Sequence, residues 1–201
     1  MKLLRTLLLG LAITGLCIPS FAFAILYTAH LDGPSEAPPN ASPGTGFAQV
    51  DYDPLAHTLN VDAIFSGLIG TTTASHIHSA TAVPGTGTAG VATSVPTFTG
   101  FPLGVTSGTY SHLFDLTLAS SWNPAFITAH GGTPDGAEAA FAASLANETA
   151  YFNIHTTFRP GGEIRGFLQP VPEPSTMLLL GSGLAVMLGL CRSRRAQRRK
   201  P

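Results

Sequence analysis

Cysteine is nearly absent from this chain of 201 residues, which contains two, Cys17 and Cys191, one near each end. Residues 25–170, which lie between them, have none, so this stretch cannot contain a disulfide bond. The absence also restricts metal chemistry there. Without a thiolate, a bound metal ion needs nitrogen or oxygen ligands.

Basic residues are also scarce in that stretch. Only Arg159 and Arg165 fall within residues 25–170, against ten acidic residues, which gives a formal net charge of −8. The near-neutral balance of the whole chain, −1, is therefore the average of an acidic centre and basic ends. An acidic surface repels phosphate, which argues against nucleic acid as a partner, and it is compatible with divalent cations or with neutral and basic partners.

The first 24 residues have the three-part layout of a secretory signal peptide. Lys2 and Arg5 precede an apolar run, and the small residues Ala22 and Ala24 form a cleavage sequence, so we expect cleavage after Ala24. The alternative is an uncleaved N-terminal membrane anchor, which the short apolar run and the cleavage sequence disfavour. We therefore predict an exported protein.

Residues 171–201 have the pattern of a second membrane-directed segment. A Pro-Glu-Pro turn leads into an apolar stretch from Ser175 to Cys191, and six basic residues follow. A helix over that stretch would rise about 26 Å, slightly less than the roughly 30 Å hydrocarbon core, and it can cross a bilayer if its flanks snorkel. The pattern thus predicts a transmembrane helix, and the basic cluster predicts that its C-terminal end is cytoplasmic and the domain before it outside.

The order of these three parts resembles the PEP-CTERM sorting signal of bacteria that make exopolysaccharide. The resemblance implies cleavage by a membrane-embedded transpeptidase of the exosortase type, with Pro172, Glu173 and Pro174 as the recognition residues. It also implies an inner-membrane anchor before processing and delivery to the cell surface or the extracellular matrix afterwards. Exopolysaccharide or surface proteins are the partners that this location suggests.

Residues 25–170 have the size of a single domain, and their apolar residues alternate with period two. Gly, Pro, Asp and Asn separate the short runs, as turns between strands require. The pattern predicts an all-β fold, an antiparallel sandwich or barrel. The expected strands cover residues 25–31, 46–53, 57–68, 74–79, 108–116, 150–158 and 162–169.

One segment, residues 134–148, has helical spacing instead. Phe141 and Leu145 form an apolar stripe, Asp135 suits the N-cap, and Asn147 suits the C-terminal end. We expect one short helix that packs its stripe across one end of the sandwich.

Three histidines occupy two of the expected strands. Because alternate side chains in a strand share a face, His76 and His78 point the same way, with Ile77 opposite, and His155 shares a face with Asn153. If the apolar residues face the core, the histidines lie on outward faces, where neighbouring strands can bring them together. Imidazole suits zinc and copper, and three ligands with an open position are a known arrangement, so a metal site is one interpretation. The other is that these are ordinary solvent-facing strand residues.

A second polar group follows near the end of the domain. Glu163 and Arg165 share a face of the last expected strand, after a Gly161-Gly162 turn. A hairpin at that turn makes them cross-strand neighbours of the preceding strand. We interpret Glu163 and Arg165 as a structural polar pair.

The remaining histidines receive different predictions. His112 shares a face with aromatic and apolar residues, so we expect it to point inward and to be hydrogen-bonded. His30, His57 and His130 are expected to be strand-end or loop residues without partners.

Four segments together resemble the CHRD domain, a module named after the extracellular signalling antagonist chordin and found in many exported bacterial proteins. The resemblance covers nearly all of residues 25–170, and it implies an immunoglobulin-like β-sandwich with no established enzymatic activity. The last of the segments is the most specific. They are LDGPSEAPPNASPGTGFAQVDYD (31–53), LNVDAIFSGLIGTTTASHIHS (59–79), SSWNPAFI (120–127) and ETAYFNIHTTFRPGGEIRGFL (148–168).

The His-x-His strand is also reminiscent of copper-zinc superoxide dismutase. That family needs further histidines, an aspartate and a disulfide, and the stretch after His78 supplies no histidine and no cysteine, so dismutase activity is not expected. Two hypotheses follow. The first is a non-enzymatic exported module of the surface or matrix, and the alternative is a copper- or zinc-binding β-sandwich protein that uses His76, His78 and His155.

Overall fold

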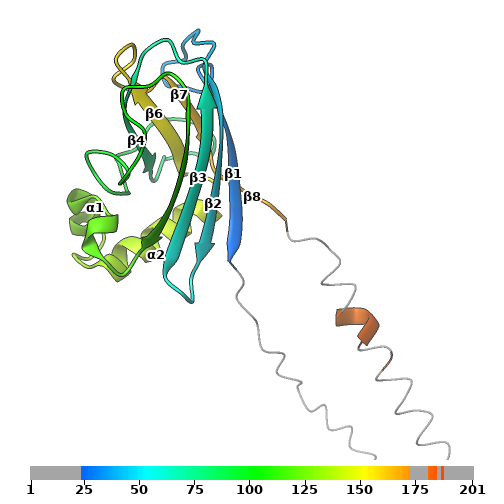
Figure 1. Ribbon diagram of the computed structural model, residues 1–201. Helices are drawn as coiled ribbons and strands as arrows, with labels where there is room; N and C mark the ends of the chain where they lie inside the picture. Colours follow the sequence, from blue (N-terminus) through cyan, green and yellow to red (C-terminus); the bar gives the residue numbers. More distant parts are fainter. Residues whose placement is uncertain (1–23, 173–180, 185–186, 188–201) are drawn as a thin grey trace, which may run out of the picture.

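The computed structural model in Figure 1 describes residues 24–172, 181–184 and 187. The expected signal peptide, apart from Ala24, and most of the expected transmembrane helix, residues 175–191, lie outside the described residues. In the part of the chain that is described, no helix is long and apolar enough to cross a membrane.

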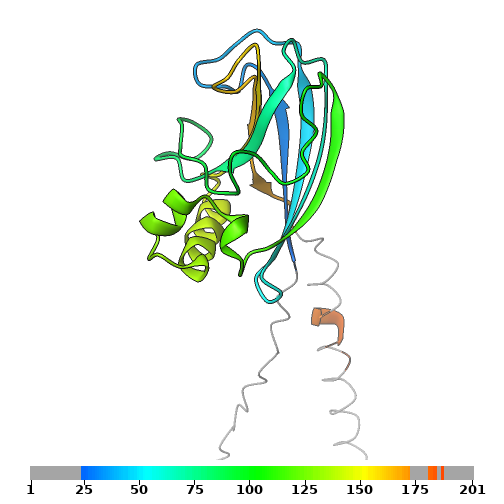
Figure 2. The ribbon, with the colours of Figure 1, turned by 60° about the vertical axis from the view of Figure 1, so that its left-hand side comes forward.

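Antiparallel strands form one continuous sheet that curls into a half-barrel (Figures 1 and 2). Its order is β4-β6-β7-β1-β2-β3-β5, and the short β8 pairs with β1. The predicted all-β antiparallel fold is confirmed, and every expected strand is present within two residues of its expected ends. The strands are β1 (Ile25–Asp32), β2 (Thr45–Asp53), β3 (Thr58–Ser66), β4 (Thr72–His78), β5 (Gly108–Asp115), β6 (Tyr151–Thr156), β7 (Ile164–Phe167) and β8 (Gln169–Pro170).

The alternation of side chains in the strands determines which face of the sheet is buried. In β2 and β3, buried residues such as Val50 and Val61 alternate with half-exposed residues such as Gln49 and Asp62. Val50 and Val61 are register partners, so they meet on the inner face of the curl. Burying such a side chain contributes about 1.5–3 kcal/mol, which favours this register over one slipped by a residue.

The gap between the two edge strands, β4 and β5, is filled by the segment 79–107. The Phe98 ring lies within 5.7 Å of the ring centroids of Tyr110, Phe114 and Phe152, and Phe98 is fully buried. The Phe98 backbone N–H also donates to the Ser75 carbonyl of β4 at 3.0 Å. This segment, which connects the expected strands 74–79 and 108–116, therefore completes the core.

The helices lie together beside the lower end of the half-barrel, on one side of the sheet (Figure 2). The expected helix is confirmed as α2, and its Phe141 and Leu145 are fully buried. The N-cap is Thr133, which accepts a hydrogen bond from the Gly136 N–H, so the prediction of Asp135 at this position is wrong. A second helix was not predicted. The helical elements are η1 (Ala119–Ser121), α1 (Pro124–Ala129) and α2 (Pro134–Ala146).

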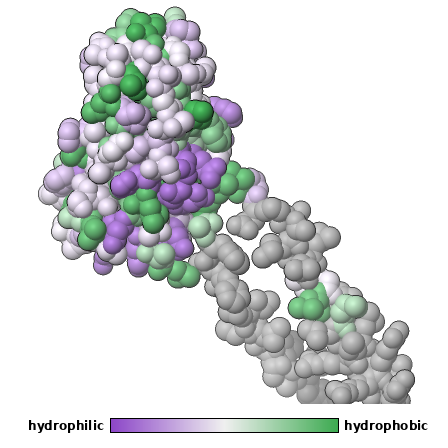
Figure 3. Space-filling model, viewed as in Figure 1, coloured by the Kyte–Doolittle hydropathy of each residue, from purple (hydrophilic) through white to green (hydrophobic). Residues whose placement is uncertain are grey.

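The surface of the sheet is mixed in character. On the face shown in Figure 3, a hydrophilic area covers part of the strands β1 to β3, and hydrophobic residues are scattered around it. Single exposed hydrophobic residues such as Ile64 and Leu113 are common on soluble domains, so this face gives no argument for a binding site.

Candidate metal centre

The pairing of β4 with β6 brings the three histidines of the sequence analysis together. Ala74 is the register partner of His155, and His76 is the partner of Asn153, two residues earlier in β6. With period-two alternation, His76, His78 and His155 then lie on the same face of the sheet. Ile77, on the opposite face, is fully buried in the core.

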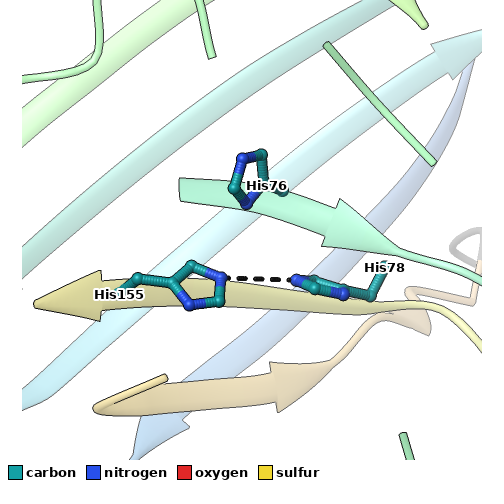
Figure 4. A group of neighbouring side chains, drawn as sticks. All are labelled: His76, His78 and His155. Atoms are coloured by element: carbon teal, nitrogen blue, oxygen red, sulfur yellow. Dashed lines mark hydrogen bonds between the residues drawn. The ribbon is translucent and has the colours of Figure 1, made fainter. Parts of the chain in front are cut away.

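The three imidazole rings converge (Figure 4). One ring nitrogen from each of His76, His78 and His155 lies within 4.8 Å of the others. The Nε2 atoms of His78 and His155 are 3.4 Å apart, and the three ring centroids are separated by 5.3 to 5.8 Å.

Hydrogen bonds to backbone carbonyls determine which nitrogen of each ring carries the hydrogen. The His76 Nε2–H donates to the Pro96 carbonyl at 2.6 Å. The Nδ1–H of His78 donates to the Ala89 carbonyl at 2.9 Å, and that of His155 to the Pro160 carbonyl at 2.9 Å. A carbonyl oxygen can only accept a hydrogen bond, so the nitrogen that faces it carries the hydrogen. The second nitrogen of each neutral ring is therefore unprotonated and has a free lone pair.

In the described part of the chain, no hydrogen is donated to these lone pairs. The Nδ1 atom of His76 is buried and lacks a hydrogen-bond partner among the described residues. The Nε2 atoms of His78 and His155 face each other, and neither carries a hydrogen in these neutral tautomers. Three lone pairs therefore converge on one small space, where a metal ion, a proton or a water hydrogen can satisfy them.

The histidines lie on the strand face opposite the core residue Ile77, as the alternation predicts, but this face is covered, so His76 and His78 are buried and His155 is partly buried. His76 is 6% exposed and His78 is 8% exposed, because the segment 79–107, which supplies Pro96 and Ala89, covers this face of β4. Burial lowers the pKa of both side chains to about 4, and it also lowers the pKa of His155. The rings are therefore neutral at neutral pH, as ligation of a metal requires.

The geometry fits a small transition-metal ion. Zinc or copper bound to imidazole nitrogens at about 2.0–2.1 Å in a tetrahedral arrangement places those nitrogens about 3.4 Å apart. The His78 and His155 nitrogens already have this separation, and His76 needs a shift of about 1 Å. Three protein ligands leave a fourth position for an external ligand.

Comparison with protein families identifies the domain that carries these residues. A family model of the CHRD domain matches residues 27–168, which is more than half of the chain. The chain belongs to the CHRD family. A second model, the PEP-CTERM protein-sorting motif, matches residues 170–195. Neither a search of curated proteins nor a search of solved structures finds a match.

The two matches confirm both resemblances noted in the sequence. The PEP-CTERM motif implies an exported protein that is processed by an exosortase-type enzyme and sorted to the surface. The CHRD domain and the sorting motif are both non-catalytic families. Of the predicted recognition residues, Pro172 follows the CHRD domain directly, and Glu173 and Pro174 lie outside the described residues.

The predicted pairing of Glu163 with Arg165 in the CHRD domain is wrong, because each of the two buried side chains has partners of its own. Glu163 accepts hydrogen bonds from the hydroxyls of Ser42 and Thr156 and from two backbone N–H groups. Burial raises the pKa of Glu163, but these hydrogen bonds outweigh it and lower the pKa overall. Arg165 forms its ion pair with Glu36, at 3.8 Å.

Two other expectations for histidines of the CHRD domain meet different outcomes. His112 lies on the inner face, as expected, where its ring contacts Phe114 at a centroid distance of 4.4 Å, but among the described residues its ring has no hydrogen-bond partner, so that part of the prediction is wrong. His57 and His130 were expected to have no partners, and both predictions are wrong. The His57 Nδ1 atom lies 2.8 Å from Oε2 of Glu138 on α2, and the His130 Nδ1–H donates to the Phe126 carbonyl at 2.8 Å. His57 and Glu138 are 81 positions apart, a separation at which a loop histidine gives no signal of its partner.

Two contributors to the site were missed. Tyr151 stacks on the His78 ring at a centroid distance of 4.8 Å, with the planes 4° apart. Its position was accessible to the period-two argument, because it precedes His155 by four residues in the same strand. Glu36, which is buried beside Arg165, lies in the loop between β1 and β2, where no periodic pattern exists.

Proposed function

We propose that this protein is an exported, surface-displayed module whose CHRD domain binds one zinc or copper ion through His76, His78 and His155. The observation that carries the proposal is the convergence of three unprotonated, mostly buried imidazole nitrogens. Desolvated lone pairs without a donor are costly, and a metal ion removes that cost.

The surroundings of the rings support a metal in preference to a structural cluster. Each ring donates its other N–H to a backbone carbonyl, an outer-shell arrangement that orients metal-bound histidines and fixes their tautomer. A purely structural histidine cluster would be expected to form hydrogen bonds within itself. These tautomers prevent that, because no ring nitrogen that faces a neighbour carries a hydrogen.

The location follows from the two ends of the chain. We propose signal-peptide cleavage after Ala24, transient anchoring in the inner membrane by residues 175–191, and processing near Pro172 to Pro174. The module then reaches the cell surface or the extracellular polysaccharide, without a catalytic role of its own. The pairing of β8 with β1 brings Pro170 beside Tyr27, so the two ends of the folded domain lie close together.

Metal analysis of the purified full chain tests the binding proposal. After loading with zinc or copper and removal of free metal, we expect one equivalent per chain in the wild type. We expect almost none in the His155→Ala variant and in a His76→Ala/His78→Ala double variant. The exposed His30 provides the matched control, and His30→Ala should retain the full equivalent.

Thermal unfolding of the metal-free variants shows whether each one is folded. His155 is only partly buried, so His155→Ala is expected to keep the fold and to report on ligation alone. The proposed function would be contradicted if this variant retained a full equivalent of bound metal, or if the wild type bound none.

A further inference from the structure

A continuous set of contacts connects Arg165 to the His78 ligand. The Arg165 Nη1–H donates to the Gly87 carbonyl at 2.8 Å, and its guanidinium carbon lies 4.7 Å from the centroid of the Tyr151 ring. On its other side, Tyr151 stacks on His78. The guanidinium, the phenol ring and the imidazole therefore form a three-layer stack behind the proposed metal position.

The same residues hold the loop that orients His78. The hydroxyl of Tyr151 lies 3.2 Å from the Ala89 N–H, which donates to it. The Ala89 carbonyl accepts the His78 Nδ1–H at 2.9 Å. Arg165 at Gly87 and Tyr151 at Ala89 thus fix the backbone that sets the tautomer of His78.

Arg165 also places a positive charge near the centre. Its side chain is 4% exposed, and its partner Glu36, at 3.8 Å, is 5% exposed, so water screens neither charge well. The guanidinium of Arg165 is the member of the ion pair that stacks against Tyr151, so these contacts connect the cation to the His78 ligand.

We propose that Arg165 has two roles at the metal centre. It positions the His78 ligand, and its positive charge makes the site prefer the monovalent cuprous ion to the divalent ions Zn²⁺ and Cu²⁺. The proposal rests on the proposed function, because it concerns the ion bound by the same three histidines. A fixed cation repels a divalent ion about twice as strongly as a monovalent one at the same position. Imidazole ligands accept both copper and zinc, so the nearby charge can influence the choice.

Coulomb's law sets the size of the effect. The two stacking distances place the guanidinium roughly 10 Å from the imidazole, and one unit charge at that range changes the preference between ions that differ by one charge by roughly three- to tenfold. The uncharged ring of Tyr151 between them adds no competing charge.

The experiment compares the affinities of the full chain for Cu⁺ and Zn²⁺ at pH 8, each measured by competition with a chromophoric chelator. The ratio of the two affinities is the readout, because general loosening of the site weakens both ions and leaves the ratio unchanged. Glu36→Gln removes the carboxylate and keeps the cation, so the ratio should move toward Cu⁺. The Glu36→Gln/Arg165→Gln double variant removes the pair, so the ratio should move toward Zn²⁺, and the two variants should differ by roughly three- to tenfold.

Tyr151→Phe separates positioning from charge. This variant keeps the ring stack and the guanidinium but removes the hydroxyl that contacts Ala89. Both ions should bind more weakly by a similar factor, with the ratio unchanged. Glu36→Gln is close in shape to the wild type, so it remains informative if the double variant does not fold.

The outcomes distinguish the role of Arg165 from the existence of the three-histidine site. Binding of both ions with the same ratio in wild type, Glu36→Gln and the double variant would overturn the role of Arg165 and leave the three-histidine site intact. Failure of the wild type to bind either ion would overturn the site itself, and the role of Arg165 with it.

Discussion

At the scale of single residues, the notable feature of the domain is that several ionisable side chains are buried with incomplete partners. His76 has an unpartnered Nδ1 atom, and Glu36 has an unpartnered Oε1 atom, in each case among the described residues. Burial lowers the pKa of histidine and raises the pKa of glutamate, because it disfavours the charged form of each side chain. The pKa of His76 is lowered to about 4, so this ring is neutral at neutral pH, whereas the pKa of Glu36 is raised to about 7, so this carboxyl loses its proton only near neutral pH.

Glu36 makes the stability of the metal-free protein depend on pH. Burial raises its pKa from 4.5 to about 7, while Arg165 and the Ala37 backbone act in the opposite direction. The folded protein keeps this proton to about pH 7, whereas the unfolded chain releases it near pH 4.5. The contribution to stability is thus fully present below about pH 4.5 and is lost as pH rises through about 7.

Glu36→Gln should remove this dependence. We expect the variant to be more stable than the wild type at pH 8, by about 1–3 kcal/mol, and to lose this advantage at pH 4.5. Urea unfolding of the metal-free proteins at the two pH values measures the difference. Glu148→Gln, at a half-exposed position, is the control and should show little change at either pH. Equal stability of Glu36→Gln and wild type at both pH values would contradict the assignment.

At the scale of elements, the strands were predictable from the sequence and the helical region only in part. The alternation in 46–53 and 57–68 identifies β2 and β3, because one face of each strand is buried and the other is half-exposed. The six-residue α1 is too short to show a helical period, although Pro124 at its first turn follows the N-cap Asn123. The core position of Phe98 in segment 79–107 depends on the gap between distant strands, so no local pattern reveals it.

The candidate site was also predictable from the sequence only in part. The shared face of His76 and His78 follows from their spacing, and the pairing of their strand with that of His155 follows only from the folded topology. The tautomers depend on the carbonyls of Pro96, Ala89 and Pro160, which side-chain identity does not encode. The chemical argument for a metal therefore required the three-dimensional structure.

Packing of α2 on the sheet gives a second test at this scale. Phe141 is fully buried and meets Trp122 edge-on at a centroid distance of 5.5 Å. Phe141→Ala should lower the free energy of unfolding by about 3–5 kcal/mol, because it leaves a cavity that the neighbouring aromatic rings cannot fill. Leu118→Ala, at a half-exposed position, is the control and should cost less than about 1 kcal/mol. Urea denaturation compares them, and equal effects of the two changes would show that α2 does not belong to the core.

At the scale of the whole molecule, the chain combines a folded CHRD domain with a sorting motif that begins where the domain ends. The last backbone hydrogen bond of the domain runs from the Val171 N–H to the Leu26 carbonyl at 2.8 Å, and Pro172 follows immediately. Cleavage at or beyond Pro172 therefore leaves every strand of the sheet in place. Processing changes the location of the domain without removing any part of its core.

The sorting motif is tested in a bacterial host that has an exosortase-type enzyme. Replacement of Pro172, Glu173 and Pro174 by alanine should leave the chain unprocessed and associated with the inner membrane, and the wild type should be released to the surface. Immunoblotting of cell fractions follows both mass and location. A triple variant with the exposed Pro34, Pro39 and Pro84 changed to alanine removes three prolines from loops of the domain and controls for general effects on export. Normal processing of the Pro172 to Pro174 variant would refute the role of these residues.

The pairing of β8 with β1 has one more consequence, which concerns the order of the chain. Thr28 is the register partner of Gln169, and Tyr27 is the register partner of Pro170. The first and last strands of the domain are therefore paired, and the two ends of the domain lie close together. A short Gly/Ser linker between residues 171 and 25 could therefore close the backbone into a ring, and new ends could be opened in an exposed turn such as that around Leu55. We therefore expect the CHRD domain of this protein to tolerate circular permutation. We also expect that it can be inserted as one unit into a loop of another protein with its histidine cluster intact.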